Sequence, residues 1–340
     1  MQEQSKAKTS SKIDVKKIFS RLGPLLALVV LVILVTIMSP TFVSPANLLN
    51  LLRQVSINAV IAFGMTFVIL TGGIDLSVGS ILALSGAVTA SMLASGFAAP
   101  LALLAGLVLG AIFGLLNGIL IAYGKAAPFI ATLATMTIFR GATYVFTNGN
   151  PITGAKMNSS FLFQFMGRGY LFGIPFPIII MLVAYGVLFV LLHKTPFGRK
   201  TYALGGNETA ARIAGVRTKM VTMLIYTISG LMAAIAGIIL TSRLSSAQPD
   251  AGTSYEMDAI AAVVLGGTSL AGGKGRIFGT LIGALIIGTL NNGMNLLGIS
   301  SFYQQIVKGI VILIAVLLDR RSSNNGLQNV SACSRQKTKL

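Results

Sequence analysis

The chain has 340 residues, of which 54% are hydrophobic and 10% are charged, and its mean hydropathy is +0.83. Soluble proteins carry about 25% charged residues, so the composition excludes a water-soluble fold of this length and indicates an integral membrane protein. The net charge of +18 does not indicate nucleic-acid binding, because the basic residues lie in tails and short loops. The single cysteine, Cys333, excludes an intramolecular disulfide, and no metal site is predicted.

The chain starts with a polar, basic stretch, residues 1–21, which we interpret as a flexible cytoplasmic tail. The apolar run 22–38 is long for a signal peptide, and no small-residue cleavage pattern follows it, so we interpret it as the first transmembrane helix. With nine further runs it predicts an all-α polytopic membrane protein of about ten transmembrane helices. These runs are 51–71, 77–94, 100–123, 128–147, 174–193, 219–241, 259–267, 277–297 and 302–318.

The basic residues predict the orientation of these helices. Positive charge beside spans marks the cytoplasmic side, and an even number of spans leaves both termini on one side. The residues that fall on this side are Lys125, Arg199, Lys274, Arg276, Arg320 and Arg321. We therefore expect a transmembrane domain over 22–318, with cytoplasmic N and C termini in the tails 1–21 and 319–340.

Two glycine-rich stretches, 72–79 and 266–275, interrupt the apolar runs. Non-helical backbone at membrane depth persists only where protein or a water-filled cavity covers it, and transporters often carry paired broken helices. We therefore interpret the two stretches as a candidate pair and 259–267 as a short or broken span. Glycines at every fourth position in 106–118 and 275–283 predict close helix–helix seams, within one chain or between two copies.

Asp75 is the only acid in the first seven runs and their breaks. An ionised aspartate at the bilayer centre costs about 2.5–3.5 kcal/mol, so it lines a polar path or gate, or it caps the next helix. The cap is favoured, and the two roles are compatible. The amides of Asn58, Asn117, Asn291 and Asn295 lie in apolar runs, where an amide can hydrogen-bond a hydroxylated ligand such as a sugar or join helices. Helix joining is favoured for each one, although the spacing of the last two on one helix face raises the path role.

A loop expected on the outer side, 245–258, carries Asp250, Glu256 and Asp258. It is equally well interpreted as a docking patch for an external partner or as a solvated loop that caps the next span.

The longest polar interruption, 194–219, holds six basic residues and one acid, Glu208. It predicts a short helix over 207–214, with Asn207 as N-cap, Glu208 in the first turn and Gly215 as the stop.

The sequence contains no phosphate-binding loop for ATP hydrolysis. The stretch 266–276 fails the phosphate-loop pattern because Gly275 follows Lys274, and no other Gly-Lys-Ser/Thr occurs. We therefore expect no enzymatic activity and no cofactor.

The sequence resembles the permease subunits of bacterial ATP-binding cassette (ABC) importers for monosaccharides, most closely the ribose type. The resemblance covers about 22–321 and is carried by residues 51–59, 72–79, 128–133, 195–199, 205–208 and 259–276. In related importers the coupling helix has a Glu-Ala-Ala, three residues, Gly pattern. Here Thr209 stands in the place of that Glu, and Glu208 lies one step earlier.

The resemblance implies a homodimer of permease chains in the bacterial cytoplasmic (inner) membrane, cytoplasmic ATPase subunits that use the ATP, and an extracytoplasmic sugar-binding protein. It also implies an ATPase-coupling loop made of Gly205, Gly206, Asn207, Glu208, Thr209, Ala210, Ala211 and Gly215. The alternatives are an ion-coupled secondary sugar carrier, which needs intramembrane carboxylates where this chain offers chiefly Asp75, and a membrane-embedded enzyme, for which no nucleophile–base set is visible.

Overall fold

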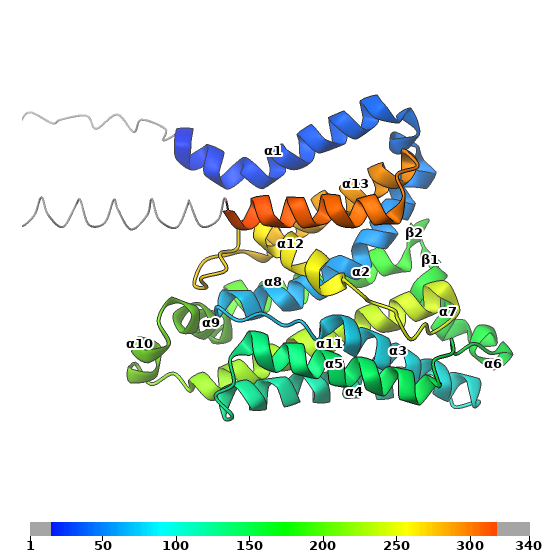
Figure 1. Cartoon of the computed structure of the whole chain (residues 1–340), viewed down its shortest axis with the longest axis horizontal. Coiled ribbons are helices and arrows are strands. Elements are labelled where there is room, and N and C mark those ends of the chain that lie inside the picture. The colour runs from blue at the N-terminus through cyan, green and yellow to red at the C-terminus, as the bar shows by residue number, and fades with distance from the viewer. Residues whose placement is uncertain (1–14, 318–340) are drawn as a thin grey trace, which may run out of the picture.

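The protein is seen here as a computed structural model that describes residues 15–317. It is a helical bundle with one short β-hairpin (Figure 1). The elements are α1 (Val15–Met38), η1 (Pro40–Val43), α2 (Pro45–Leu70), α3 (Val78–Ala94), α4 (Ala99–Ala122), α5 (Pro128–Thr147), α6 (Ala155–Ser159), α7 (Phe161–Arg168), β1 (Tyr170–Leu171), β2 (Ile174–Pro175), α8 (Phe176–Lys194), α9 (Pro196–Gly206), α10 (Glu208–Ile213), α11 (Thr218–Leu244), α12 (Tyr255–Leu265), α13 (Ile277–Leu296) and a last helix, Ser301–Leu317.

The predicted tails lie largely outside the described residues, as do Arg320, Arg321 and Cys333. At the N-terminal side the structure corrects one boundary. Helix α1 begins at Val15, inside the predicted tail 1–21, so the helix starts before its apolar part.

Six helices of the described chain are long and apolar enough to cross a membrane: α2, α4, α5, α8, α11 and α13. Three shorter apolar helices accompany them, the Gly23–Met38 part of α1, α3 and the last helix. Helix α12 has 11 residues, about 16 Å at 1.5 Å per residue, which is too short for a hydrocarbon core of about 30 Å. The short span predicted at 259–267 is therefore confirmed as a short helix.

Local sequence signals set several helix ends. Pro45 and Pro128 stand at the start of α2 and α5, where a missing N–H costs nothing. The Ser44 side chain caps α2 by accepting a hydrogen bond from the Asn47 amide at 3.4 Å. Helix α5 ends at Asn148, which takes the left-handed conformation at φ 50°. The spans thus begin and end largely where local chemistry favours it.

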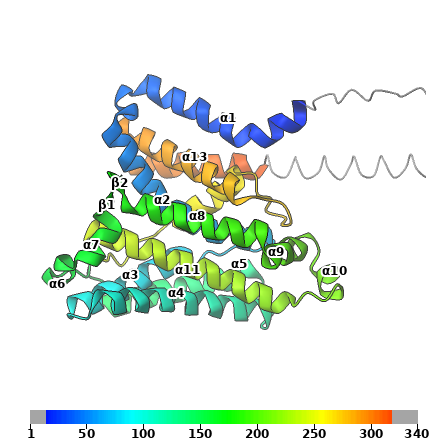
Figure 2. The same ribbon diagram turned by 180° about the vertical axis from the view of Figure 1, so that it is seen from behind.

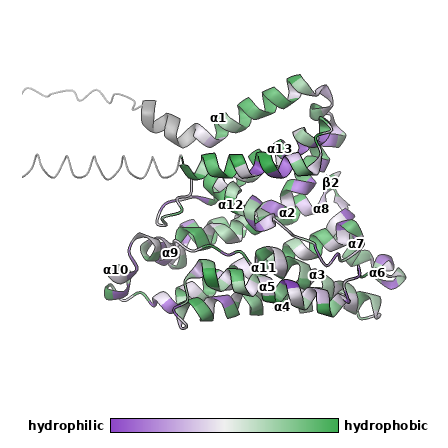
Figure 3. Cartoon of the chain, viewed as in Figure 1, coloured by the Kyte–Doolittle hydropathy of each residue, from purple (hydrophilic) through white to green (hydrophobic). Residues whose placement is uncertain are grey.

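The bundle has an interior and flanks. Helices α2, α11 and α13 are mostly buried, whereas α4, α5 and α8 are mostly exposed. Helices α4 and α5 form one side of the molecule, and α1 lies on the opposite side (Figure 1); α8 comes forward in the view from behind (Figure 2). The spans are mostly hydrophobic and α10 is hydrophilic (Figure 3). A helix that is apolar all round belongs in a core or in lipid, so the exposed apolar flanks fit a membrane.

The two ends of the bundle differ. At the left in Figure 1, here called the coupling-loop end, lie α9, α10, the start of α1 and the end of the last helix. At the right, here called the hairpin end, lie η1, α6, α7 and the hairpin, in which Tyr170 pairs with Pro175 and Leu171 with Ile174.

The predicted glycine seams are confirmed, and both join helices of the same chain. A Cβ on Gly114 would lie 2.2 Å from the Tyr226 carbonyl oxygen, and one on Gly230 would lie 2.2 Å from the Gly110 oxygen, so α4 and α11 pack backbone to backbone. A Cβ on Gly283 would lie 1.8 Å from the Ala262 oxygen, which places α13 equally close to α12. Only glycine permits these approaches.

We predict that Gly114→Leu lowers the thermal unfolding temperature of the purified protein by several degrees. The added side chain has no space against α11, and overpacking costs about 1–3 kcal/mol. The matched control is Gly141→Leu on α5, where a Cβ meets nothing within 4 Å. Equal unfolding temperatures for the two variants would contradict this account of the seam.

Candidate functional site

The polar stretch 194–219 folds as two short helices, α9 and α10, that protrude at the coupling-loop end (Figure 1). The Asn207 side chain accepts a hydrogen bond from the Ala210 amide at 2.9 Å, which confirms the predicted cap. Gly215 takes φ +85° and ends the turn, as predicted. Ile213 on α10 is 81% exposed. The loop therefore presents a capped helix with an apolar tip, while its role in coupling stays a prediction.

The loop is fixed to the bundle at the carbonyl oxygen of Leu70, the last residue of α2. This oxygen accepts a hydrogen bond from the Gly273 amide at 2.9 Å. A Cβ on Gly205, near the end of α9, would lie 1.7 Å from the same oxygen. Backbone from α9, α2 and the 266–276 segment thus meets at one point, here called the Leu70 junction.

The Leu70 junction also brings the two predicted glycine-rich breaks together. Residues 72–77 and 266–276 are non-helical, as expected. A Cβ on Gly272 would lie 3.0 Å from the Gly72 amide nitrogen. The two breaks are therefore in contact, although whether they border a transport path is untested.

A tyrosine adds a second tie between the loop and the 266–276 segment. The Tyr202 hydroxyl on α9 donates a hydrogen bond to the Gly275 carbonyl at 2.8 Å. Burial raises the pKa of Tyr202, and nearby Arg276 partly opposes this by favouring the phenolate. The hydroxyl therefore keeps its proton and donates at physiological pH.

Asp75 lies fully buried in the first break. One carboxylate oxygen accepts from the Ser77 amide at 3.0 Å and the Ser77 hydroxyl at 2.6 Å, and the other accepts from the Ser229 hydroxyl at 2.8 Å. The Ser77 bonds hold the turn that leads into α3, whose N-cap residue is Ser77 without a side-chain capping bond, so the cap role of Asp75 stays a prediction. The Ser229 bond ties the break to α11.

The predicted amides divide by their contacts. Asn117 donates to Ser77 at 2.8 Å, and Asn295 accepts from Gln304 at 2.8 Å, so both join separate elements. Asn58 approaches Asp258 at 3.5 Å. Asn291 is buried, and its side-chain oxygen has no hydrogen-bond partner among residues 15–317. These contacts agree with helix joining for three of the four.

The acidic outer loop is held down against the bundle. Arg140 on α5 donates to the Pro249 and Ala251 carbonyls, each at 2.8 Å. Asp250 is exposed and Glu256 half-buried. Asp258 corrects the prediction of a docking role, because it is 4% exposed and points into the bundle. It lies in the first turn of α12, directly before the apolar residues of that helix.

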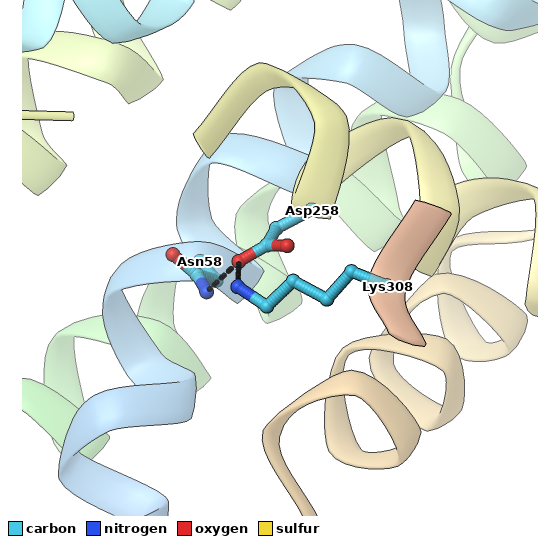
Figure 4. Close-up of polar contacts among 3 residues, drawn as sticks. All are labelled: Asn58, Asp258 and Lys308. Atoms are coloured by element: carbon cyan, nitrogen blue, oxygen red, sulfur yellow. Dashed lines mark hydrogen bonds and ion pairs between the residues drawn. The ribbon is translucent and has the colours of Figure 1, made fainter. Parts of the chain in front are cut away.

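Asp258 forms the ion pair that the sequence analysis missed. Its Oδ2 lies 3.0 Å from Lys308 Nζ, and Asn58 approaches the same oxygen (Figure 4). The three side chains come from α12, the last helix and α2, so the pair anchors an otherwise exposed last helix to the interior. The signal was present in the sequence, since a lysine inside an apolar run is rare and usually paired.

The fold and these polar contacts define a multi-pass helical membrane protein whose basic loop is joined to the bundle interior at the Leu70 junction. The family model described as "Branched-chain amino acid transport system / permease component" matches residues 47–316. The chain therefore belongs to this permease family and is a transport component, not itself an enzyme.

Curated relatives match over almost the whole chain. The ribose import permease RbsC of Bacillus subtilis is 66% identical over 312 residues, which is 92% of this chain and 96% of the relative. The ribose import permease RbsC of Escherichia coli K12 is 54% identical, covering 87% and 92%. The L-arabinose permease AraH of Escherichia coli K12 is 42% identical, covering 91% and 93%. No solved structure matches the chain.

We predict that Lys308→Met lowers the unfolding temperature, because it leaves the Asp258 carboxylate buried without a cation. The loss falls between the about 1 kcal/mol of an exposed pair and the about 3–5 kcal/mol of a fully buried one, since the Lys308 side chain is 23% exposed. Adding Asp258→Asn to this variant restores most of the stability.

The measurement is thermal unfolding of the detergent-purified protein, followed by size-exclusion chromatography. Lys156→Met, at an exposed lysine of α6, is the control and leaves the temperature unchanged. A double variant no more stable than Lys308→Met alone would contradict the pairing.

Proposed function

We propose that this chain is the permease subunit of an ATP-driven importer that carries ribose across the bacterial cytoplasmic membrane. The observation that carries the proposal is the 66% identity with a ribose import permease across nearly both whole chains. The ribose permeases of Haemophilus influenzae and Escherichia coli follow at 53% and 54%, whereas the D-allose and L-arabinose permeases reach 40% and 42%. This ordering favours ribose over the other sugars.

The proposal includes ten membrane passes with cytoplasmic N and C termini. In support, the start of α1 and the end of the last helix lie at the coupling-loop end, which also bears α9 and α10 (Figure 1). Lys194, Arg199, Lys200, Arg212, Arg217 and Lys219 gather at the same end, and basic residues concentrate on the cytoplasmic side.

In this account, α10 docks on a cytoplasmic ATPase subunit, which hydrolyses the ATP. The support is the exposed, capped helix with Ile213 at its tip and Glu208 in its first turn. The Leu70 junction and Tyr202 then pass the movement of the loop to α2 and to both breaks. Two copies of the chain form the membrane core, and a sugar-binding protein delivers ribose at the hairpin end. Asp250, which is exposed, and Glu256, which is half-buried, remain candidates for docking that protein.

The sugar path remains the least constrained part of the proposal. Asn58 and Asn291 each keep a buried side-chain oxygen without a hydrogen-bond partner among the described residues. A buried amide oxygen without a partner is costly, and a sugar hydroxyl can satisfy it. The Asn117 side-chain oxygen is also buried without a partner among the described residues. We therefore propose Asn58, Asn117 and Asn291 as path residues, ahead of Asp75 and Asn295, whose contacts serve the fold.

Uptake of labelled ribose tests the proposal, in cells that lack their own ribose permease and carry this chain with its ATPase and binding protein. We expect uptake that unlabelled ribose blocks and that an ATPase-inactive partner abolishes. Ribose uptake that persists with the inactive ATPase would instead support an ion-coupled carrier. A lack of ribose uptake by an assembled complex would contradict the substrate.

The coupling loop has its own test. We predict that Glu208→Ala combined with Gly215→Val reduces co-purification of the ATPase about tenfold, because valine resists φ +85° and distorts the end of α10. Membrane insertion stays unchanged. The control, Gly298→Val, places valine at a similar φ of +68° with nothing within 4 Å, at the far end of α13. Normal ATPase co-purification by the double variant would contradict the role of this loop.

A further inference from the structure

A cavity of about 1040 Å³ opens at the coupling-loop end, beside α10. One wall is the turn between α4 and α5, with Tyr123 and Lys125. The other is the first turns of α11, and Arg212 of α10 borders it. The position matters, because α4 and α11 are membrane-spanning helices by length and composition, so the cavity lies where spans meet the aqueous side.

The lining is strongly basic. Lys125, Arg212, Arg217 and Lys219 contribute four positive charges, and Glu208 contributes the one negative charge. Lys219 is held over the ring of Tyr123, with its Nζ 4.8 Å from the ring centroid. Side chains of one charge around one cavity repel each other, so the arrangement favours an anionic occupant.

The start of α11 adds to this field. The helix has 27 residues, and its N-cap, Arg217, makes no side-chain capping bond. The first backbone N–H groups of a helix have no intrahelical partner, and the helix dipole places partial positive charge there. They supplement the cationic side chains; alone they would define no site.

The cavity lining also includes apolar side chains. Ile121, Met220 and Met223 line it, and Met220 and Tyr123 are largely exposed beside it. A second cavity of about 470 Å³ shares Arg217 and Met220 and adds Phe197 and Leu224. A free phosphate needs no such apolar surface, and a docking protein would not be expected to reach between the ends of spans. An amphiphile with an anionic head uses both surfaces.

We propose that this cavity binds an anionic phospholipid of the leaflet at the coupling-loop end, with its phosphate held by Lys125, Arg217 and Lys219 and its acyl chains along Ile121, Met220 and Met223. Basic pockets between helices at the cytoplasmic boundary are suited to such headgroups. Because α10 forms part of the cavity wall, the bound lipid contacts the coupling loop and stabilises its position. The inference holds whichever sugar is carried.

The test is lipid retention by the full chain, purified in detergent with its partner subunits and measured by native mass spectrometry. The probes are phosphatidylglycerol and phosphatidylcholine of the same acyl length. We expect bound phosphatidylglycerol in preference to phosphatidylcholine. The triple variant Lys125→Gln, Arg217→Gln, Lys219→Gln retains it at least about tenfold less. The control variant Lys194→Gln, Arg199→Gln, Lys274→Gln removes the same charge from the same end, outside the cavity lining, and retains it.

The single variant Lys219→Gln, with an intermediate loss, guards against misfolding of the triple variant, and both must elute as a single size-exclusion peak. Equal retention by the wild type and the triple variant would overturn the proposal. Displacement of phosphatidylglycerol by excess inorganic phosphate, whatever the acyl length, would reassign the cavity to a free anion. Loss of the ATPase subunit with lipid retained would reassign it to a protein contact.

Discussion

The carbonyl oxygen of Leu70 is the point on which the coupling-loop end of the structure depends. It ends α2, the central helix of the bundle, and it accepts the Gly273 amide while the backbone of Gly205 lies against it. A buried carbonyl must find a donor, and three chain segments can meet here only because two of them contribute glycine. The contact joins both non-helical breaks to the polar loop through main-chain atoms, which do not change rotamer.

The Leu70 junction joins the loop to the membrane-spanning helices. A helix joined to the bundle only by flexible backbone would move without displacing the spans. Here α9 contacts α2 at Gly205 and the break that precedes α13 through the Tyr202 hydroxyl. In the function proposed above, these contacts carry a displacement of α10 to both. The first break is in turn tied to α11 through Asp75 and Ser229. The polar groups of the interior thus connect the loop to helices that must move in a permease.

Much of this could be predicted from the sequence, because the signals are local. Apolar runs predicted the six long apolar helices and the shorter apolar helices beside them, Asn207 predicted the cap of α10, and glycines at every fourth position predicted the seams. The contacts between distant segments could not be predicted. Nothing near Asp258 in the sequence indicates Lys308, 50 residues away, so a buried ion-pair partner was assigned to a loop interpreted equally as a docking patch or as solvated. The meeting of the two breaks at Leu70 likewise depends on how the helices pack.

The most direct test compares two adjacent glycines of α9. A Cβ on Gly205 would lie 1.7 Å from the Leu70 oxygen, whereas a Cβ on Gly206 meets nothing within 4 Å. Ribose uptake and ATP hydrolysis would be measured for the assembled importer carrying Gly205→Ala or Gly206→Ala. The account predicts that Gly205→Ala separates hydrolysis from uptake, lowering uptake per ATP about tenfold or more, while Gly206→Ala transports normally. Equal transport by the two variants would contradict the junction as the link between motor and membrane.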